Sequence, residues 1–276
     1  MLAKAPGLPA DELVVDLEDA VAASMKAAAR ARVVEALASE DWADVAVSVR
    51  INAPRTPWCH LDAIALAAIA RQPVAIVIPK VESAGDLAFV ERLLDGAEAA
   101  AGRAVPLRVQ ALIETAAGLA QVQAIAGAST RLDALILGYA DLAVSLGRTM
   151  AGGADLDGWR PAQELLLLAA RAHGLQAIDG PHLGLEVDSA FSAAVARARD
   201  LGFDGKWAIH PAQLPPLNEA FTPSEDEVVR ARAVIAALAR AEREDGAGAV
   251  ALDGQMLDEA VRTAALRTLA RGGKLA

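Results

Sequence analysis

Two stretches decide the fold: Leu107-Arg-Val-Gln-Ala-Leu-Ile-Glu-Thr115, and Leu132-Asp-Ala-Leu-Ile-Leu-Gly-Tyr-Ala-Asp-Leu142 further along the chain. Each contains a short apolar run that is followed by a carboxylate, Glu114 in the first and Asp141 in the second. Nearly continuous apolar runs of this length are typical of parallel strands covered by helices on both faces. We therefore expect two neighbouring strands of a buried parallel sheet, each delivering an acidic side chain at its carboxyl end.

Similar runs recur along the chain at intervals of roughly 30 residues, the length of one strand–helix–strand unit. The predicted strands cover residues 13–17, 45–51, 74–79, 107–113, 132–137, 175–178 and 206–209. Stretches rich in Ala, Leu, Glu and Arg lie between them, and the predicted helices include residues 22–37, 84–101, 118–126, 161–172 and 187–201. This alternation predicts an α/β protein with a parallel sheet.

Polar side chains at the strand ends favour a closed barrel over an open sheet. Nearly every strand is followed by a titratable side chain: Asp16, Arg50, Lys80, Glu114, Asp141, Asp179 and His210. A barrel gathers all of its strand ends at one mouth, whereas an open sheet binds its ligand at one switch point. No Gly-x-Gly-x-x-Gly follows the first strand, so the dinucleotide-binding alternative loses its main support. We predict a (β/α)₈ TIM barrel.

The barrel is expected to occupy residues 1–221. Seven strands are found where the fold requires eight, so we expect the first strand to lie upstream of Met1 in a longer chain. Ser224 and Glu227 have the spacing of a capping box, which predicts a helix from residue 225 to about residue 244. After the Gly246-Ala-Gly248 break, a last helix is expected from about residue 257 to residue 270. Residues 222–276 are thus predicted to form a helical extension or lid.

Composition excludes several classes of protein. The net charge of −10 over 276 residues argues against a nucleic-acid partner, although local Lys and Arg can still bind a small anionic ligand. The single cysteine, Cys59, excludes an intrachain disulfide and a thiolate metal cluster. No uncharged apolar run reaches the length of about 18 residues that a membrane span requires, and no secretory segment begins the chain. We expect a cytoplasmic protein without a membrane partner.

Glu114 and Asp141 are the first candidate site. Carboxylates at the ends of adjacent strands repel each other unless one is protonated or a cation lies between them. With no His/Cys cluster in the sequence, oxygen ligands favour Mg²⁺, with Mn²⁺ as the alternative metal. Residue type alone leaves a second interpretation open, in which the two carboxylates pair with Lys or Arg of the mouth.

Three other strand-end residues are candidates for substrate binding or catalysis. The paired N–H groups of the Arg50 guanidinium can bind a carboxylate or a developing oxyanion. Alternatively, Arg50 forms an ion pair with Asp16 or Glu18. Lys80 has the amine of a Schiff-base aldolase, but the acids around it favour its ammonium form, so we expect ion pairs there. His210 is either a general base or a hydrogen-bonded core residue.

Eight motifs follow one another along almost the whole chain. They include Val15-Asp-Leu-Glu-Asp-Ala-Val21, Ile78-Pro-Lys-Val-Glu82 and Gly205-Lys-Trp-Ala-Ile-His-Pro211, and the others are residues 49–52, 112–115, 138–147, 177–181 and 253–258. Together they resemble the citrate lyase β-subunit-like branch of the HpcH/HpaI aldolase/citrate lyase superfamily, which includes malyl-CoA and citramalyl-CoA lyases. Each motif alone is weak, and their order makes the resemblance specific.

The resemblance implies a role for individual residues. Glu114 and Asp141 look like the Mg²⁺ ligands and Arg50 like the substrate-binding arginine, which would also stabilise an enolate oxygen. Asp258 resembles the catalytic acid/base that these lyases supply from their C-terminal segment. The remaining substrate-binding positions are the amides of Gly138, Tyr139 and Ala140, which would hold an oxo-acid carboxylate, and Lys4, which would reach a CoA phosphate.

The implied activity is that of a Mg²⁺-dependent carbon–carbon lyase. It would cleave a 3-hydroxyacyl-CoA thioester of the malyl-CoA or citramalyl-CoA type to an acyl-CoA and an oxo acid. The resemblance also implies a homotrimer or hexamer in which residues 222–276 pack on a neighbouring subunit. Three alternatives remain: a citrate lyase β-subunit acting on a citryl thioester, a metal-dependent hydroxy-oxo-acid aldolase, and a non-catalytic remnant that binds CoA or metal.

Overall fold

A computed structural model describes residues 2–39, 42, 45–69, 75–148 and 156–273 of the chain. The chain divides into two compact units, Met1–Pro215 and Pro216–Ala276, called here the first and the second unit. The observed division falls inside helix α9 (Leu214–Phe221), and the predicted boundary lies at the end of the same helix. Within the described residues, no helix is long and apolar enough to cross a membrane.

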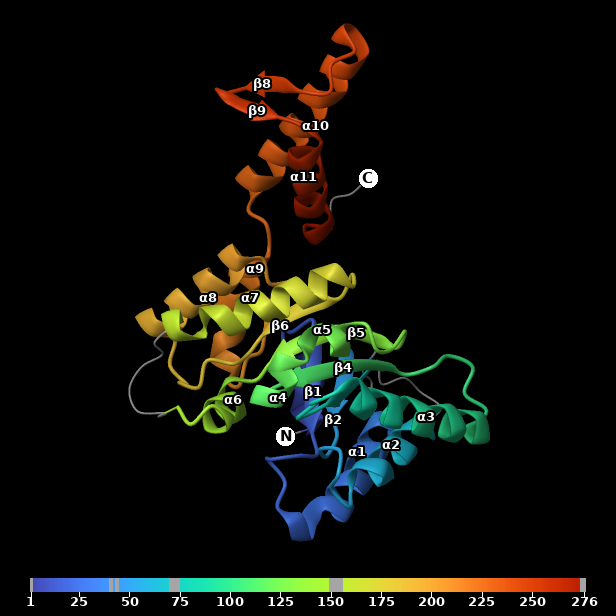
Figure 1. The fold of residues 1–276 in the computed structure, drawn as a ribbon. Coiled ribbons are helices and arrows are strands. Elements are labelled where there is room, and N and C mark those ends of the chain that lie inside the picture. Colours follow the sequence, from blue (N-terminus) through green and yellow to red (C-terminus); the bar gives the residue numbers. More distant parts are fainter. Residues whose placement is uncertain (1, 40–41, 43–44, 70–74, 149–155, 274–276) are drawn as a thin grey trace. The chain divides into compact units, whose positions relative to one another are not determined.

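The first unit is built on a seven-stranded parallel sheet whose strands follow one another in chain order (Figure 1). The strands are β1 (Glu12–Asp16), β2 (Ala46–Arg50), β3 (Ala75–Ile78), β4 (Arg108–Ile113), β5 (Leu132–Leu137), β6 (Gln176–Asp179) and β7 (Gly205–Lys206). Each strand overlaps one of the predicted apolar runs, and every neighbouring pair is parallel. The prediction of an α/β protein with a parallel sheet is confirmed.

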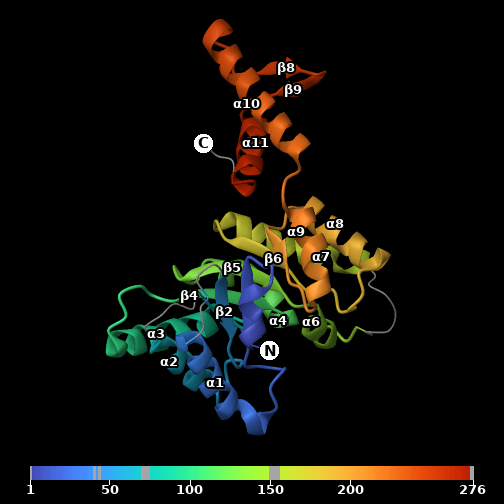
Figure 2. The same cartoon turned by 180° about the vertical axis from the view of Figure 1, so that it is seen from behind.

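Helices connect the strands, and several of them touch one another to form an outer row in chain order. They are α1 (Lys26–Ser39), α2 (Cys59–Ala67), α3 (Ala84–Ala101), α4 (Ala116–Ala120), α5 (Val122–Ala126), α6 (Tyr139–Ser145), α7 (Leu156–Ala172) and α8 (Ser189–Leu201), with short 3₁₀ turns at Leu2–Gly7, Ala23–Met25 and Pro211–Gln213. Contacts run from α1 to α2, α2 to α3, α3 to α5 and α5 to α7. A row of helices in chain order is the outer layer of a TIM-barrel-like fold, and Figure 2 shows it from behind.

Local sequence sets the ends of several helices. At α3, Ser83 and Asp86 form a capping box, and the helix ends at Gly102, whose positive φ of 67° favours glycine. The predicted helix at 118–126 is two short helices, because Gln121 leaves helical geometry between α4 and α5.

The sheet is strongly curved. Strands β1 and β4 are not neighbours, yet Gln110 Nε2 donates a hydrogen bond of 2.8 Å to Glu12 Oε1. An inner apolar cluster likewise joins side chains from β1, β3, β4, β5 and β6: Val14, Val77, Leu112, Ile136 and Ile178, with Trp207 beyond β7. Such contacts require the sheet to curl around its own interior, as in a barrel. Within the described residues no strand joins β7 to β1, so the eighth strand and the closed barrel stay a prediction.

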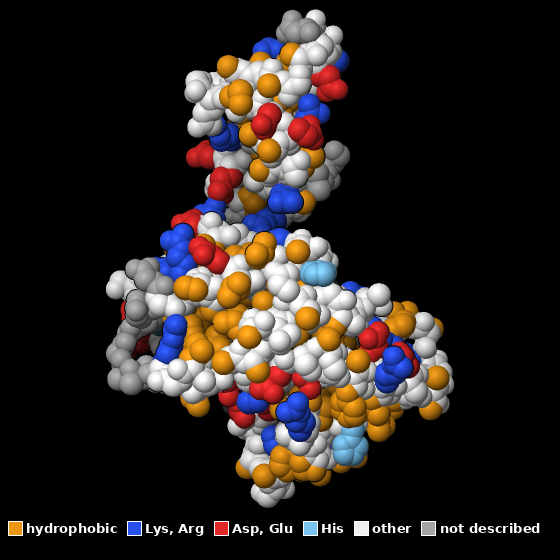
Figure 3. Space-filling view, in the orientation of Figure 1, with side chains coloured by type: hydrophobic (Ala, Val, Ile, Leu, Met, Phe, Trp, Pro, Cys, Tyr) orange, Lys and Arg blue, Asp and Glu red, His pale blue; other side chains and the backbone are white. Residues whose placement is uncertain are grey.

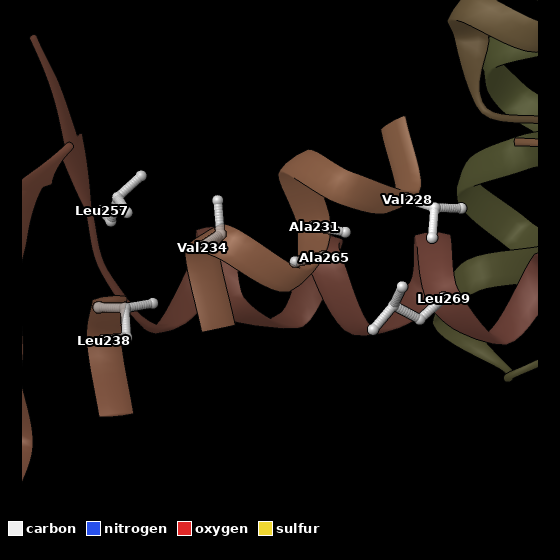
Figure 4. Close-up of a cluster of buried hydrophobic side chains, with 7 residues drawn as sticks. All are labelled: Val228, Ala231, Val234, Leu238, Leu257, Ala265 and Leu269. Carbon is white, nitrogen blue, oxygen red and sulfur yellow. The ribbon is translucent and has the colours of Figure 1, made fainter. Parts of the chain in front are cut away.

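The second unit is a helical hairpin with a small β-hairpin between its helices. Helix α10 (Glu225–Asp245) begins at the expected Ser224/Glu227 capping box and ends at Gly246. It packs against α11 (Glu259–Arg271) through a core of Val228, Ala231, Val234, Leu238, Leu257, Ala265 and Leu269 (Figure 4). Strands β8 (Val250–Leu252) and β9 (Gln255–Leu257) pair antiparallel, and neither strand was predicted from the sequence.

Candidate functional site

The ends of β4 and β5 bring Glu114 and Asp141 together. Glu114 follows β4 directly and is 2% exposed, and Asp141 lies in the first turn of α6. The Gly138 N–H donates a 3.0 Å hydrogen bond to the Ile113 carbonyl, which joins the two strand ends. The Lys80 backbone N–H donates to Glu114 Oε1 at 3.0 Å, and the Lys80 ammonium lies 3.5 Å from Asp141 Oδ1. One lysine therefore contacts both carboxylates.

Glycine at position 138 makes this approach sterically feasible. A Cβ atom at this position would lie 2.6 Å from both Cβ and Oε2 of Glu114. Such a distance is well inside van der Waals contact. The Glu114 carboxylate can therefore rest against the start of α6 only because residue 138 lacks a side chain.

Electrostatics at Glu114 favour an added positive charge. The pKa of Glu114 is raised to about 8, chiefly by burial and also by the charges of Asp141 and Glu18, while Lys80 and Arg50 act in the opposite direction. A carboxylate that retains a proton near neutral pH is one whose negative charge is poorly compensated. Within the described residues, no group of three or more His, Cys, Asp or Glu side chains is arranged to hold a metal. A pair of carboxylate ligands nonetheless fits Mg²⁺, which commonly keeps water or substrate in its other positions.

Lys80 is held as an ammonium ion. Its Nζ lies 2.5 Å from Glu18 Oε1 and 3.4 Å from Asp19 Oδ2. Burial lowers the pKa of Lys80, but the hydrogen bond and charge of Glu18, together with Glu114 and Asp141, outweigh burial and raise it above its usual range. A permanently protonated amine is a poor nucleophile. The expected ion pairs of Lys80 are confirmed.

Arg50 is engaged by the end of the neighbouring strand. Its Nε and Nη2 donate to the two oxygens of Asp16 at 2.8 and 2.6 Å, and Nη1 lies 3.3 Å from Glu18 Oε2. Burial lowers the pKa of Arg50, and the hydrogen bond and charge of Asp16 more than offset that effect. The two hydrogen bonds to Asp16 fix the orientation of the Arg50 guanidinium, and the Nη1 atom of Arg50 faces Glu18. The structural partner expected for Arg50 is therefore present, and its role toward a substrate stays a prediction.

A second polar cluster, not predicted from the sequence, joins the start of α6 to the end of β6. The Tyr139 hydroxyl donates a very short hydrogen bond to Asp179 Oδ1, and Gln163 Nε2 donates to the Tyr139 oxygen at 2.8 Å. Lys206 Nζ lies 2.6 Å from Asp179 Oδ2, in a pair whose side chains are only 2% and 1% exposed. Burial raises the pKa of Tyr139, and the Asp179 carboxylate adds to that effect, so the phenol keeps its proton.

The other predicted residues occupy varied positions. Tyr139 and Ala140 begin α6, whose first-turn amides lack partners within the helix. The Lys4 side chain lies outside the described residues. Asp258, in the second unit, caps α11 by accepting the Val261 N–H at 3.1 Å, and its proposed catalytic role is untested. His210 is exposed, and its Nδ1 accepts the Ala212 N–H at 3.2 Å, so it is not a core residue.

Charged side chains of both signs lie next to one another amid apolar surface on the first unit (Figure 3). A carboxylate pair with one buried member, Glu114, and one partly exposed member, Asp141, lies beside Lys80 and Arg50 at the strand ends of a curved parallel sheet. This arrangement is typical of an enzyme built on a β/α scaffold. The chain belongs to the HpcH/HpaI aldolase/citrate lyase family, whose model matches residues 1–211. By this membership it is an enzyme of the carbon–carbon lyase class.

Known proteins resemble the chain over most of its length. An L-malyl-CoA/beta-methylmalyl-CoA lyase of Cereibacter sphaeroides is 41% identical over 265 residues, which are 90% of this chain and 83% of that protein. A (3S)-malyl-CoA thioesterase of the same species is 38% identical over 275 residues, 100% of this chain and 91% of that protein. The solved structure of the protein CitE from Mycobacterium tuberculosis, in complex with magnesium, acetoacetate and coenzyme A, is 33% identical with a TM-score of 0.76 and covers 96% of this chain and 90% of that one.

Proposed function

We propose that the chain is a Mg²⁺-dependent lyase that cleaves a 3-hydroxyacyl-CoA thioester of the malyl-CoA type to an acyl-CoA and an oxo acid. The observation that carries the proposal is the Glu114–Asp141 pair at the strand ends, in which the buried Glu114 has a poorly compensated negative charge beside the partly exposed Asp141. The lyase and the magnesium-bound, CoA-bound structure among the similar proteins support the same chemistry.

In this proposal Glu114 and Asp141 hold the ion. A bound Mg²⁺ supplies a Lewis acid that polarises the substrate oxygens. Lys80 keeps both ligands in place, since it contacts the carboxylate of one through its ammonium group and that of the other through its backbone N–H. The amides of Tyr139 and Ala140 would receive the carboxylate of the oxo acid, because the first-turn N–H groups of a helix point toward an anion. The Gly138 N–H, which was expected to take part, donates to the Ile113 carbonyl instead.

Cleavage of the carbon–carbon bond would require two further groups, which are Arg50 and Asp258 in this proposal. The hydroxyl of the substrate would lose its proton to solvent water and its carbon would become the carbonyl of the oxo acid, while the electrons of the broken carbon–carbon bond would form a thioester enolate. Arg50, preoriented by Asp16, would stabilise the enolate oxygen. Asp258 would protonate the enolate carbon, which releases the acyl-CoA.

We further propose a closed (β/α)₈ barrel and a site shared between subunits of a trimer or hexamer. The curvature of the seven strands supports closure by one more strand. The second unit folds around its own core and carries Asp258, so it is suited to cover a mouth as a separate body. Residues 222–276 would then act on a neighbouring subunit.

The direct test is to incubate the protein and Mg²⁺ with a panel of 3-hydroxyacyl-CoA acids and to identify the products. Formation of an acyl-CoA together with an equal amount of an oxo acid supports the lyase, and the Glu114→Gln variant and excess chelator serve as controls. The thioesterase among the similar proteins favours one second candidate, hydrolysis of the same thioester. Hydrolysis would release free CoA and a hydroxy acid without any oxo acid. If every substrate in the panel is recovered intact, the proposal is wrong.

A further inference from the structure

The start of helix α6 is anchored from behind by the side chain of Tyr139. Tyr139 is the first residue of α6, and its hydroxyl donates to Asp179 at the end of β6. The Tyr139 ring covers Gly180 so closely that a Cβ atom at position 180 would lie 2.8 Å from ring atom Cδ2. The Trp159 ring packs edge-on against it, with ring centroids 5.2 Å apart. Tyr139 is therefore fixed both by packing and by a hydrogen bond.

The acceptor of that hydrogen bond is itself rigidly held. Asp179 is 1% exposed and is paired with Lys206, whose Nζ also donates to the Gly180 carbonyl at 2.5 Å. Gln163, 2% exposed, donates to both the Tyr139 oxygen and Asp179 Oδ1. A buried carboxylate with this many partners offers a well-defined anchoring point.

The anchor lies two residues from Asp141. Helix α6 has seven residues, and a helix this short depends on tertiary contacts for its position. The Gly138 N–H ties its start to the end of β4, and the Tyr139 hydroxyl ties it to β6. These two contacts hold the start of α6, next to Asp141, and the Lys80 ion pair holds the Asp141 carboxylate itself.

We propose that Tyr139 is a positioning residue whose hydroxyl, bound to the Asp179–Lys206 pair, holds α6 so that Asp141 and Glu114 together form the metal site. This inference rests on the proposed function for its metal, and it concerns the side chain of Tyr139 rather than its amide. Side chains that orient a ligand group from behind contribute to metal affinity without touching the ion.

Tyr139→Phe isolates the hydroxyl. The ring and its packing remain, and Asp179 keeps Lys206 and Gln163 as partners, so no buried charge is left unpaired. We expect the Mg²⁺ dissociation constant, measured by calorimetry on the full chain, to rise about tenfold.

Ser145→Ala provides a matched control. Ser145 Oγ accepts the Ala116 N–H at 2.9 Å, so this variant also removes one hydroxyl tether from α6, but at the end of the helix away from Asp141. Its Mg²⁺ dissociation constant should match that of the wild type within about twofold. Urea midpoints from tryptophan fluorescence verify that both variants remain folded.

A Tyr139→Phe dissociation constant within twofold of the wild type would overturn the proposal, as would an equal weakening in both variants. A wild-type chain that binds no Mg²⁺ would refute the proposed function instead. In that case hydrogen exchange of the α6 amides decides the role of Tyr139. Faster exchange at residues 141–144 in Tyr139→Phe but not in Ser145→Ala supports the anchor, and unchanged exchange overturns it.

Discussion

The buried carboxyl of Glu114 should make the metal-free protein lose stability as the pH rises. The pKa of Glu114 is raised from 4.5 to about 8, first of all by burial. A group whose pKa is raised on folding binds its proton more tightly in the folded chain, so its contribution to stability is full below pH 4.5 and is lost as the pH rises through about 8. The whole shift in pKa corresponds to a change of roughly 5 kcal/mol in the free energy of unfolding.

Glu114→Gln removes the titrating group but keeps an oxygen that can accept the Lys80 N–H. Between pH 6 and pH 8 the wild type in chelator should lose up to about 1.4 kcal/mol per pH unit relative to the variant. Urea unfolding followed by tryptophan fluorescence measures this difference. The four tryptophans, Trp42, Trp58, Trp159 and Trp207, all lie in the first unit, so their signal reports the unit that contains Glu114.

Added Mg²⁺ and a control variant provide two further comparisons. Saturating Mg²⁺ should flatten the pH dependence of the wild type, because a cation then compensates the charge in place of the proton, and it should stabilise Glu114→Gln far less. Glu164→Gln makes the same chemical change at a side chain that is 55% exposed, and its stability should follow the wild type within about 0.5 kcal/mol at every pH. If wild type and Glu114→Gln keep a constant difference from pH 6 to pH 8 in chelator, the account of the Glu114 charge is refuted.

Three further predictions concern the proposed site. Glu114→Ala and Asp141→Ala should each abolish lyase activity while the unfolding midpoint of the first unit shows that the fold is intact, and full activity of the double variant in excess chelator would disprove the metal site. Gly138→Ala should destabilise the first unit by about 1–3 kcal/mol, measured by urea unfolding, because the new Cβ collides with Glu114; an unchanged midpoint would contradict this. Asp258→Asn should keep the α11 cap, since Asn caps nearly as well as Asp, but lose turnover with Mg²⁺ binding retained. Mixed oligomers of Asp258→Asn and Glu114→Ala subunits should regain activity, and verified mixtures that stay inactive would show that Asp258 does not act across an interface.

The sequence predicted the sheet well because strand position depends on local apolar runs. All seven runs became neighbouring strands in chain order. The β8–β9 hairpin was missed because its strands are three residues each. The sequence feature that could have revealed the hairpin is Asp253-Gly254, because Asp-Gly is a frequent hairpin turn. Both residues have a positive φ in the structure.

Site residues were predictable as types, but only some of their pairings were predictable. A charged residue after each strand shows that a mouth is polar, yet side-chain partners depend on strand register and on the curvature of the sheet. The sequence left Asp16 and Glu18 as alternative partners of Arg50, and the register, which places Arg50 beside Asp16, explains why Asp16 accepts two of its hydrogen bonds. The link from Tyr139 to Asp179 joins segments 40 residues apart, and the spacing of motifs carries no information about such a contact.

Consecutive pairing of the strands has a consequence for how the site is assembled during synthesis. Each strand pairs with the one made just before it, so the sheet can grow unit by unit as the chain emerges, without waiting for distant segments. Both carboxylates of the pair are present once residue 141 has been made. Lys206, which holds the anchor of α6, is made 65 residues later (206 − 141). A nascent chain therefore carries the two acids well before the contacts that fix their spacing, and the geometry of the site matures only when the last strand joins the sheet.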